Sequence, residues 1–392
     1  MERLARAQAS AGHSVDVVHC IDAYRFFARN EPKSEPQETP NLTTHGLRSG
    51  LGFISPLLSH QTGRPLLKRS RIQSILDQRQ PDVIHFHNIS LFGAKVMEIR
   101  PARGHVVKLF SLHDHWLVCP TSVLWKYQKR PCERAQCFAC TLRSGRPPQL
   151  WRYSGLLEKC IKEIDLVLTP SRFSEEMHAA RGFAAPMERL PHFALSSVEQ
   201  NGTAPAATRA RPYFLFAGRL EVIKGVESLL RAWEKVHDSD LLIAGSGSLE
   251  TQLRARAGSL PNVVFLGRLM EQELGRYYSH ALACIVPSLT YETFANVVLE
   301  AFARRTPVIA RDLGALPEMV QTSRGGLLYR SEEELLAAVS RLTTAPELRA
   351  DLAEQGYRAF VSEWSEDVYL TRYMSLIRKT AIEKFGRVPW ES

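Results

Sequence analysis

The stretch YFLFAGRLEVIKGVESLLRAW (213–233) decides the fold of this chain. It predicts a strand over 213–218, a glycine-containing loop over 219–225 and then a helix. Apolar side chains recur in that helix at the spacing of one buried face: Val226, Leu229, Leu230, Trp233 and Val236. A strand, a loop and an amphipathic helix in this order form the repeating unit of a parallel sheet covered by helices.

The same unit repeats as far as residue 311. Short apolar runs over 241–245, 263–267, 283–287 and 307–310 predict further strands. Predicted helices lie between them, over 249–257, 271–279 and 295–304. Apolar runs of this kind are typical of parallel strands buried on both faces, so the predicted fold class is α/β. Ligands of such sheets bind at the carboxyl ends of the strands.

Two cations flank the loop that follows the first of these strands. Gly218 and Arg219 come directly after the strand, and Lys224 and Gly225 open the next helix. The free amides of a helix N-terminus also attract anions. This combination predicts a site for a diphosphate.

Two carboxylates lie at the edge of the sheet where the diphosphate is expected. Glu292 is in the loop before the helix over 295–304, and Glu300 is two turns inside that helix. A helix start over 294–297 would direct its amides at phosphate oxygens, while the carboxylates accept hydrogen bonds from hydroxyls. Carboxylates for sugar hydroxyls and cations for a diphosphate indicate a nucleotide-sugar site.

The motifs in this half of the chain resemble the retaining nucleotide-sugar glycosyltransferases of family 4. The similarity runs from Tyr213 to Tyr329 and covers AGRLEVIKG, IAGSGS, VVFLGRL, PSLTYETFANVVLEAFARRTPVIARDLGALPEMV and GGLLY, with a weaker match over most of the N-terminal half. The resemblance implies the GT-B fold, in which two Rossmann-like domains face each other across a cleft. It also implies transfer of a sugar from a nucleotide-diphosphate sugar to an acceptor hydroxyl, without a protein nucleophile or a catalytic metal.

The resemblance assigns roles to residues on both sides of that cleft. His113, at the end of the strand over 106–112, would contact the donor sugar and act with Glu292, Arg219 and Lys224 in catalysis. Glu300 would hold the ribose hydroxyls. Further donor-binding residues on the same side are expected to be Gly218, Leu269, Phe294, Ala295, Asn296 and Val297.

Length and composition favour a two-domain enzyme with an anionic partner. The chain has 392 residues and a net charge of +9, with 44% hydrophobic residues. The positive charge favours a nucleotide diphosphate or an acidic membrane surface, and no aromatic–basic repeat indicates nucleic acid. No apolar stretch approaches 18 residues, so we expect a cytoplasmic protein, with peripheral contact to the inner face of the membrane as an option.

The expected N-terminal, acceptor-side domain covers 1–194. A linker over 195–212, the donor domain over 213–364 and a helix over 365–392 that crosses back to the first domain complete the division. The helix over 4–11 and the strand over 15–20 stand where the family has its first helix and second strand. The family's preceding strand and glycine-rich turn are missing, so we expect an unpaired edge within the sheet, filled by another segment or left by a truncated reading of the gene.

The remaining part of the N-terminal half offers candidates for the acceptor side. Residues 24–70 are polar and irregular and predict a long surface excursion near the acceptor side, disordered or weakly helical, with an ordinary loop as the alternative. The strand over 81–88 ends at the cleft, where Asn88 and His87 are the candidate acceptor-side residues. Because His85 and His87 share one face of that strand, one of the two is expected to be structural.

Four of the seven cysteines occur within one loop, over 119–140. Cys119, Cys132, Cys137 and Cys140 are separated by twelve, four and two residues. In a reducing compartment a tetrathiolate site is expected, most simply a structural zinc, although an iron–sulfur cluster, free thiols and disulfides remain alternatives. The same loop is basic and aromatic, which suits an anionic or lipid-linked acceptor or a plain solvated surface.

Two other functions are compatible with these motifs. One is a non-catalytic nucleotide-sugar-binding protein, and the other is a nucleotide-sugar 2-epimerase on the same fold. For the transferase, we expect a place in polysaccharide or glycoconjugate biosynthesis. Arg305 stands where the family usually has glycine, and a left-handed backbone there would carry about 1 kcal/mol of strain.

Overall fold

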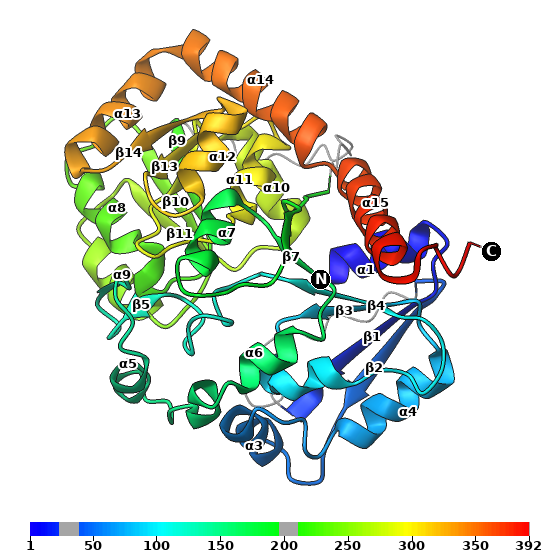
Figure 1. Ribbon diagram of the computed structural model, residues 1–392. Coiled ribbons are helices and arrows are strands. Elements are labelled where there is room, and N and C mark those ends of the chain that lie inside the picture. The colour runs from blue at the N-terminus through cyan, green and yellow to red at the C-terminus, as the bar shows by residue number, and fades with distance from the viewer. Residues whose placement is uncertain (23–38, 196–210, 392) are drawn as a thin grey trace.

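The computed structural model describes residues 1–22, 39–195 and 211–391 (Figure 1). They form two α/β bodies with parallel sheets, the C-terminal body being mostly yellow to orange in the figure. This arrangement confirms the predicted fold class. Most of the predicted linker, residues 196–210, lies outside the described residues, as does part of the predicted excursion, residues 23–38.

The C-terminal body is built on a six-stranded parallel sheet with the order β11-β10-β9-β12-β13-β14. Its strands are β9 (Tyr213–Ala217), β10 (Asp240–Ala244), β11 (Val263–Gly267), β12 (Cys284–Val286), β13 (Val308–Arg311) and β14 (Gly326–Tyr329). The order reverses at β9, whose neighbours are β10 and β12. Ligand sites of open α/β sheets lie at such a reversal, and here the loops after β9 and β12 meet.

Helices cover both faces of this sheet. One face packs against α8 (Val226–Trp233), α9 (Glu250–Ala257) and α13 (Glu332–Thr344). The other packs against α10 (Glu271–His280), α11 (Asn296–Phe302), α12 (Leu316–Ser323) and α14 (Pro346–Glu363). Strand residues such as Leu215 and Leu242 are fully buried, which explains why their apolar runs were recognisable.

The N-terminal body contains two separate parallel sheets among the described residues. One pairs β1 (Val15–Cys20) with β2 (Leu42–Leu47). The other has the order β3-β4-β7-β8, formed by β3 (Val83–His87), β4 (Val107–Ser111), β7 (Leu166–Thr169) and β8 (Met187–Arg189). Since β1 and β3 do not pair with each other, the expected unpaired edge is present. The strands β5 (Trp125–Lys126) and β6 (Arg130–Pro131) form a short antiparallel hairpin.

Short helices surround these sheets, and the last helix of the chain joins them. The α-helices of this body are α1 (Glu2–Ser10), α3 (Ile54–Thr62), α4 (Arg69–Arg79), α5 (Cys137–Arg143), α6 (Leu156–Ile161) and α7 (Arg172–Ala179). The 3-10 turns are η1 (Ile89–Leu91), η2 (Ala94–Glu98), η3 (Leu150–Tyr153) and η4 (Val222–Lys224), the last in the C-terminal body. The long helix α15 (Glu366–Phe385) lies beside α1 (Figure 1).

Helix α15 belongs to the N-terminal body by its packing. Tyr369, Tyr373 and Ile377 join the same apolar cluster as Leu4 and Val107. The Tyr373 hydroxyl also contacts His85 Nδ1 at 2.9 Å. The expected return of the chain to the first body is therefore seen, except that Ile382 is exposed and Ala381 takes the buried position.

The expectation of a disordered or weakly helical excursion over 24–70 did not include a strand, and in this respect it is wrong. Residues 42–47 form β2, which pairs with β1 in register, and residues 54–62 form α3. The β2 sequence LTTHGL has few apolar side chains and only Leu47 is buried, so it lacked the apolar run expected of a parallel strand. Pro56 in the first turn of α3 is compatible with a helix start.

Arg305 does adopt the left-handed conformation expected from its position, with φ at 53°. The strain is accompanied by two contacts of its side chain. The guanidinium lies 3.8 Å from the centre of the Tyr357 ring and forms an ion pair with Glu354. Arg324 has the same φ of 53°, and its side chain makes no hydrogen bond or ion pair within the part of the chain that the structure describes.

These two arginines provide a matched test of backbone strain. We expect Arg324→Gly to raise the free energy of unfolding by about 1 kcal/mol, because glycine accepts positive φ without a steric penalty. Arg305→Gly should leave stability almost unchanged, because the lost ion pair and cation–π contact are together worth about the same amount. Denaturation midpoints in urea measure both changes, and an equal gain in the two variants would contradict this account.

Candidate functional site

The loop between β12 and α11 is where the two bodies meet. The Thr293 hydroxyl donates to the carbonyl oxygen of His113 at 3.0 Å, and the Ser171 hydroxyl donates to the carbonyl oxygen of Thr293 at 2.7 Å. The ring of His115 contacts the carbonyl oxygen of Tyr291 through Nε2 at 3.0 Å. Since Glu292 lies between Tyr291 and Thr293, the N-terminal body fixes the backbone on both sides of it.

Lys224 and Glu292 form an ion pair at the carboxyl edge of the sheet. Lys224 Nζ lies 2.6 Å from Glu292 Oε1, and the Ser288 hydroxyl donates to the same oxygen at 2.7 Å. The two side chains are 24% and 15% exposed, so both are reachable from solvent. The structure thus brings together a cation and a carboxylate that the sequence places 68 residues apart. An anionic ligand on Lys224 would have to compete with this carboxylate.

Gly225 allows the close approach behind this pair. Its φ is 72°, and a Cβ atom there would lie 2.1 Å from the carbonyl oxygen of Pro287. The backbone N–H of Leu289 donates to the carbonyl oxygen of Ile223 at 2.8 Å. Only glycine fits this position, and the contact holds Lys224 against the loop that carries Glu292.

The other predicted donor-side residues lie on the same edge. Arg219 is exposed directly after β9, and the Gly218 N–H donates to the carbonyl oxygen of Ala244. Phe294 and Ala295 are buried beneath the start of α11, whereas Asn296 is exposed there. Val297 and Leu269 are half-buried and pack on the same apolar cluster.

Glu300 makes contacts that the sequence did not suggest. Its carboxylate accepts a hydrogen bond from the Tyr278 hydroxyl at 3.3 Å and lies 3.5 Å from the Arg3 guanidinium. Arg3 also pairs with Glu271 at 3.0 Å, so α1 contributes a cation to the C-terminal body. Burial raises the pKa of Glu300, and Arg3 opposes that rise. Arg3 lies 297 positions before Glu300, and no local pattern marks it.

His113 belongs to a line of histidines that crosses between the two bodies. His87 Nδ1 lies 2.7 Å from His113 Nε2, and His113 Nδ1 lies 3.2 Å from His192 Nε2. His192 Nδ1 in turn lies 3.0 Å from Asn296 Oδ1 at the start of α11. His192 was not among the predicted residues, although it lies close before the predicted linker.

Burial makes these imidazoles neutral at physiological pH. It lowers the pKa of His113 to about 3 and that of His192 to about 4, and it holds the pKa of His87 well below its usual value. A neutral imidazole donates one hydrogen bond and accepts one. With Asn296 Oδ1 as the acceptor at one end, His192, His113 and His87 each carry their proton on Nδ1. Both ring nitrogens of His113 are then occupied by other imidazoles.

The two acceptor-side candidates differ in their surroundings. His87 is part of the histidine line, whereas Asn88 is exposed, with φ at 41°, and its side chain accepts a hydrogen bond from Ser90. His85 contacts the Ser111 hydroxyl at 2.8 Å as well as Tyr373. Of the two histidines on this strand face, His85 is therefore the one held by structural partners.

The predicted tetrathiolate site is not found among the residues that the structure describes. No group of three or more His, Cys, Asp or Glu side chains there is placed to hold a metal ion, and all seven cysteines are free thiols. Other groups engage the sulfur atoms: Cys119 contacts the Thr121 hydroxyl at 3.2 Å, and Cys140 accepts the Tyr127 N–H at 3.3 Å. Burial and then the neighbouring cysteines raise the pKa of Cys137, which favours neutral thiols.

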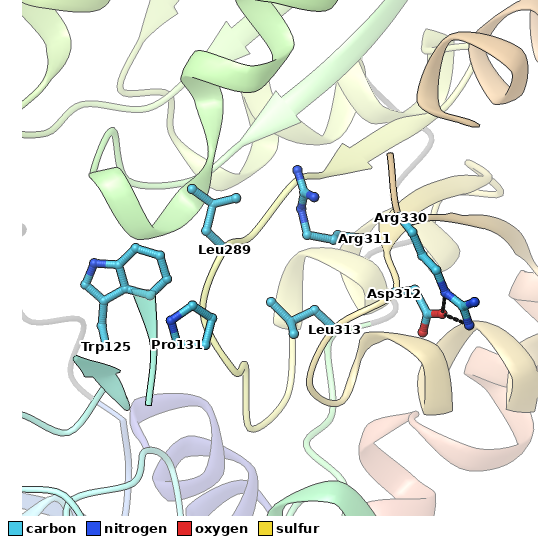
Figure 2. Close-up of a pocket in the computed structure, with 7 residues that line it drawn as sticks. All are labelled: Trp125, Pro131, Leu289, Arg311, Asp312, Leu313 and Arg330. Atoms are coloured by element: carbon cyan, nitrogen blue, oxygen red, sulfur yellow. Dashed lines mark hydrogen bonds and ion pairs between the residues drawn. The ribbon is translucent and has the colours of Figure 1, made fainter. Parts of the chain in front are cut away.

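A pocket of about 310 Å³ lies between the hairpin β5–β6 and the C-terminal sheet. Figure 2 shows Trp125, Pro131 and Leu289 grouped at one side, with the ion pair between Arg330 and Asp312 at the other. Sequence analysis missed this pocket because its lining comes from four segments spread over some 200 residues. Leu289 connects it to the loop that carries Glu292.

The buried histidines predict a loss of stability in mild acid. The folded pKa values of these histidines are lowered, so below pH 6.5 they are protonated in the unfolded chain but not in the folded one. The free energy of unfolding therefore falls as the pH falls. Each such histidine should cost about 2 kcal/mol between pH 7 and pH 5. Unfolding in urea at pH 7 and at pH 5 measures the drop in the free energy of unfolding. This drop should be about 2 kcal/mol smaller in His113→Gln than in the wild type. The exposed His13→Gln is the control, and an equal drop in both variants would refute the prediction.

Family models cover most of the chain. A model described as Glycosyltransferase Family 4 matches residues 1–193, and one described as Glycosyl transferases group 1 matches residues 211–345. Among solved structures, the chain resembles sucrose-phosphate synthase from Thermosynechococcus elongatus, with a TM-score of 0.72, 23% identity and coverage of 96% of this chain and 91% of that one. It also resembles Anabaena HepE in complex with UDP, with a TM-score of 0.63, 15% identity and coverage of 87% and 86%.

Curated relatives are similar over shorter stretches. An uncharacterized glycosyltransferase of Methanocaldococcus jannaschii is 33% identical over 44% of this chain and 46% of its own length. A GDP-mannose-dependent monoacylated alpha-(1-6)-phosphatidylinositol monomannoside mannosyltransferase of Corynebacterium glutamicum is 30% identical over 57% of this chain and 64% of its own. The chain thus spans about half to two thirds of the length of these relatives. With its GT-B architecture and the matches to both family models, the chain belongs to glycosyltransferase family 4.

Proposed function

We propose that this protein transfers a sugar, with retention of configuration, from a nucleotide-diphosphate sugar to an acceptor hydroxyl. The proposal depends on one observation above all. Thr293, the residue after Glu292, donates a hydrogen bond to the carbonyl oxygen of His113. The N-terminal body therefore contacts the loop directly beside the Glu292–Lys224 pair. A site assembled from both bodies at the carboxyl edge of a sheet suits a reaction between two bound substrates.

Cations at this edge would bind the donor's diphosphate. Arg219 and Lys224 lie in the connection between β9 and α8, and the amides of Asn296 and Val297 open α11. The names of two similar proteins support the donor class, since one is called GDP-mannose-dependent and another was crystallised with UDP. Glu300, in the second turn of α11, would accept hydrogen bonds from the ribose hydroxyls.

The reaction requires charge stabilisation more than a nucleophile. As the bond between the sugar's anomeric carbon and the diphosphate breaks, negative charge grows on the leaving oxygen, and Arg219 and Lys224 would stabilise it. The acceptor oxygen would bond to the anomeric carbon on the same face and pass its proton to the departing phosphate. Glu292 would hold sugar hydroxyls. His113 would position the sugar from the opposite body, which requires a sugar hydroxyl to replace His87 or His192 as the partner of one of its ring nitrogens.

The acceptor class follows from weaker observations. One similar protein is named for a phosphatidylinositol monomannoside acceptor, and this chain carries a basic, aromatic loop over 119–153 on its acceptor side. Both favour a carbohydrate or lipid-linked acceptor in the synthesis of a polysaccharide or glycoconjugate. Asn88 and His87 are the side chains we would first test for acceptor binding.

The ion pair at the centre of the site gives a direct mutational test. Lys224→Ala and Glu292→Ala should each lower kcat at least tenfold, because each removes a group that contacts the donor in the transition state. The pair Lys235–Glu332 has the same separation of 2.6 Å but is more exposed, at 59% and 29%, and joins the residues after α8 to the start of α13. Lys235→Ala and Glu332→Ala are therefore the controls and should leave kcat within about twofold. Equal losses at both pairs would remove Lys224 and Glu292 from the catalytic site.

Donor identity can be measured by calorimetry with UDP-, GDP- and ADP-sugars. We expect one of them to bind to the purified chain and to lose at least tenfold in affinity in Arg219→Ala, because a charge-assisted contact to phosphate is worth roughly 1.5–3 kcal/mol. Release of free nucleotide with an acceptor present would establish transfer. Binding without release would indicate a non-catalytic binding protein, and a product that keeps the nucleotide would indicate an epimerase.

A further inference from the structure

The exposed apolar side chains of this protein are concentrated on one part of the N-terminal body. Among the described residues, sixteen large apolar side chains are strongly exposed, and ten of them lie within 51–67 or 138–153. These ten are Leu51, Phe53, Ile54, Leu57, Leu66, Leu67, Phe138, Leu142, Leu150 and Tyr153. The two segments account for less than a tenth of the chain, so this is not the usual scatter of single exposed residues.

Two helices in these segments are oriented opposite to ordinary surface helices. Helix α3 buries Ser55, Pro56 and Ser59, while Ile54 and Leu57 are 52% and 39% exposed. Helix α5 buries Cys140 and Thr141, while Phe138 and Leu142 are 51% and 54% exposed. A surface helix normally turns its apolar face to the core. Here small and polar side chains face the core and large apolar ones face outward.

Hydrogen bonds join the two segments into one surface. The Trp151 indole N–H donates to the carbonyl oxygen of His60 at 2.9 Å, and the Gln61 amide donates to the carbonyl oxygen of Pro147 at 3.4 Å. Tyr153 of η3 also lies close to Phe138 of α5. Helix α3 contacts η3, and η3 in turn lies close to α5. Figure 1 shows α3 and α5 on the lower side of the N-terminal body.

Basic side chains are concentrated in the same two segments and in the residues that flank them. Residues 48–71 and 126–153 contain twelve Arg or Lys and one Glu, a net charge of +11, whereas the whole chain has +9. The rest of the chain is thus slightly acidic. Nine of the twelve cations are exposed, and within the described part of the chain none of them forms an ion pair: Arg48, Arg64, Arg69, Arg71, Lys129, Arg130, Arg134, Arg143 and Arg146.

We propose that α3, η3 and α5 form a docking face for an anionic lipid bilayer. Exposed apolar side chains would enter the boundary between headgroups and acyl chains, and the surrounding arginines would contact lipid phosphates. No helix in the described ranges is long and apolar enough to cross a membrane. A soluble polyanion would use the arginines but would give no role to the outward-facing Ile54, Leu57, Phe138 and Leu142.

Co-sedimentation with vesicles tests the proposal without donor or acceptor, so its result is independent of the transferase activity. We expect the protein to bind vesicles of phosphatidylcholine with 30% phosphatidylglycerol and not vesicles of phosphatidylcholine alone. The triple variant Arg64→Gln, Arg143→Gln and Arg146→Gln should bind about 100-fold more weakly, because each cation near an anionic surface contributes about fivefold. Its control is Arg276→Gln, Arg324→Gln and Arg341→Gln, three exposed arginines of the C-terminal body.

The apolar contribution distinguishes a bilayer from a soluble polyanion. Ile54→Ser with Phe138→Ser should weaken vesicle binding at least tenfold and leave binding to poly-glutamate unchanged. Val361→Ser with Ile382→Ser removes two exposed apolar side chains from α14 and α15 and should change neither. Melting temperatures within the range of the wild type ensure that each variant is folded. The proposal is overturned by absence of binding to anionic vesicles, or by wild-type vesicle binding in the Ile54 and Phe138 double variant.

Discussion

Hydrogen bonds between the N-terminal body and residues 290–293 stabilise the candidate site. His115, Ser171 and the His113 carbonyl contact this loop, and Thr290 donates its hydroxyl to the carbonyl oxygen of Val123. A loop that follows a short strand has few backbone partners of its own, so its conformation depends on these contacts. The position of Glu292 is therefore a property of both bodies together.

The C-terminal body could be predicted almost completely from the sequence, and the N-terminal body only in part. Strands such as Asp240–Ala244 are buried throughout, and their nearly continuous apolar runs are typical of strands in a parallel sheet. β2 was missed because Thr43 and Thr44 are polar and exposed and only Leu47 is buried. Its pairing with β1 is a contact between distant segments. The periodicity of a short stretch of sequence does not predict contacts between distant segments.

The same distinction applies to the candidate site. Lys224 and Glu292 were recognisable because each stands in a motif at the end of a strand, and the structure brings them to 2.6 Å. His192 and Arg3 stand in no motif, and their partners Asn296 and Glu300 belong to the other body. For the cysteines, the sequence predicted a site that the structure does not show. Four cysteines lie close together in the sequence, but they form no ligand set among the described residues.

The position of α15 has a consequence for how the two bodies can move. Because α15 packs on the N-terminal body, the chain passes between the bodies twice, once after Ala194 and once near Trp364. These crossings lie side by side, since the Ala194 N–H donates to the carbonyl oxygen of Trp364 at 3.3 Å. Two adjacent connections act as a hinge, and rotation about it separates the bodies most at the edge remote from the crossings. Separation of the bodies then requires breaking the hydrogen bonds and ion pairs between them, at the Glu292 loop, at His192 and at Arg3, rather than unfolding either body.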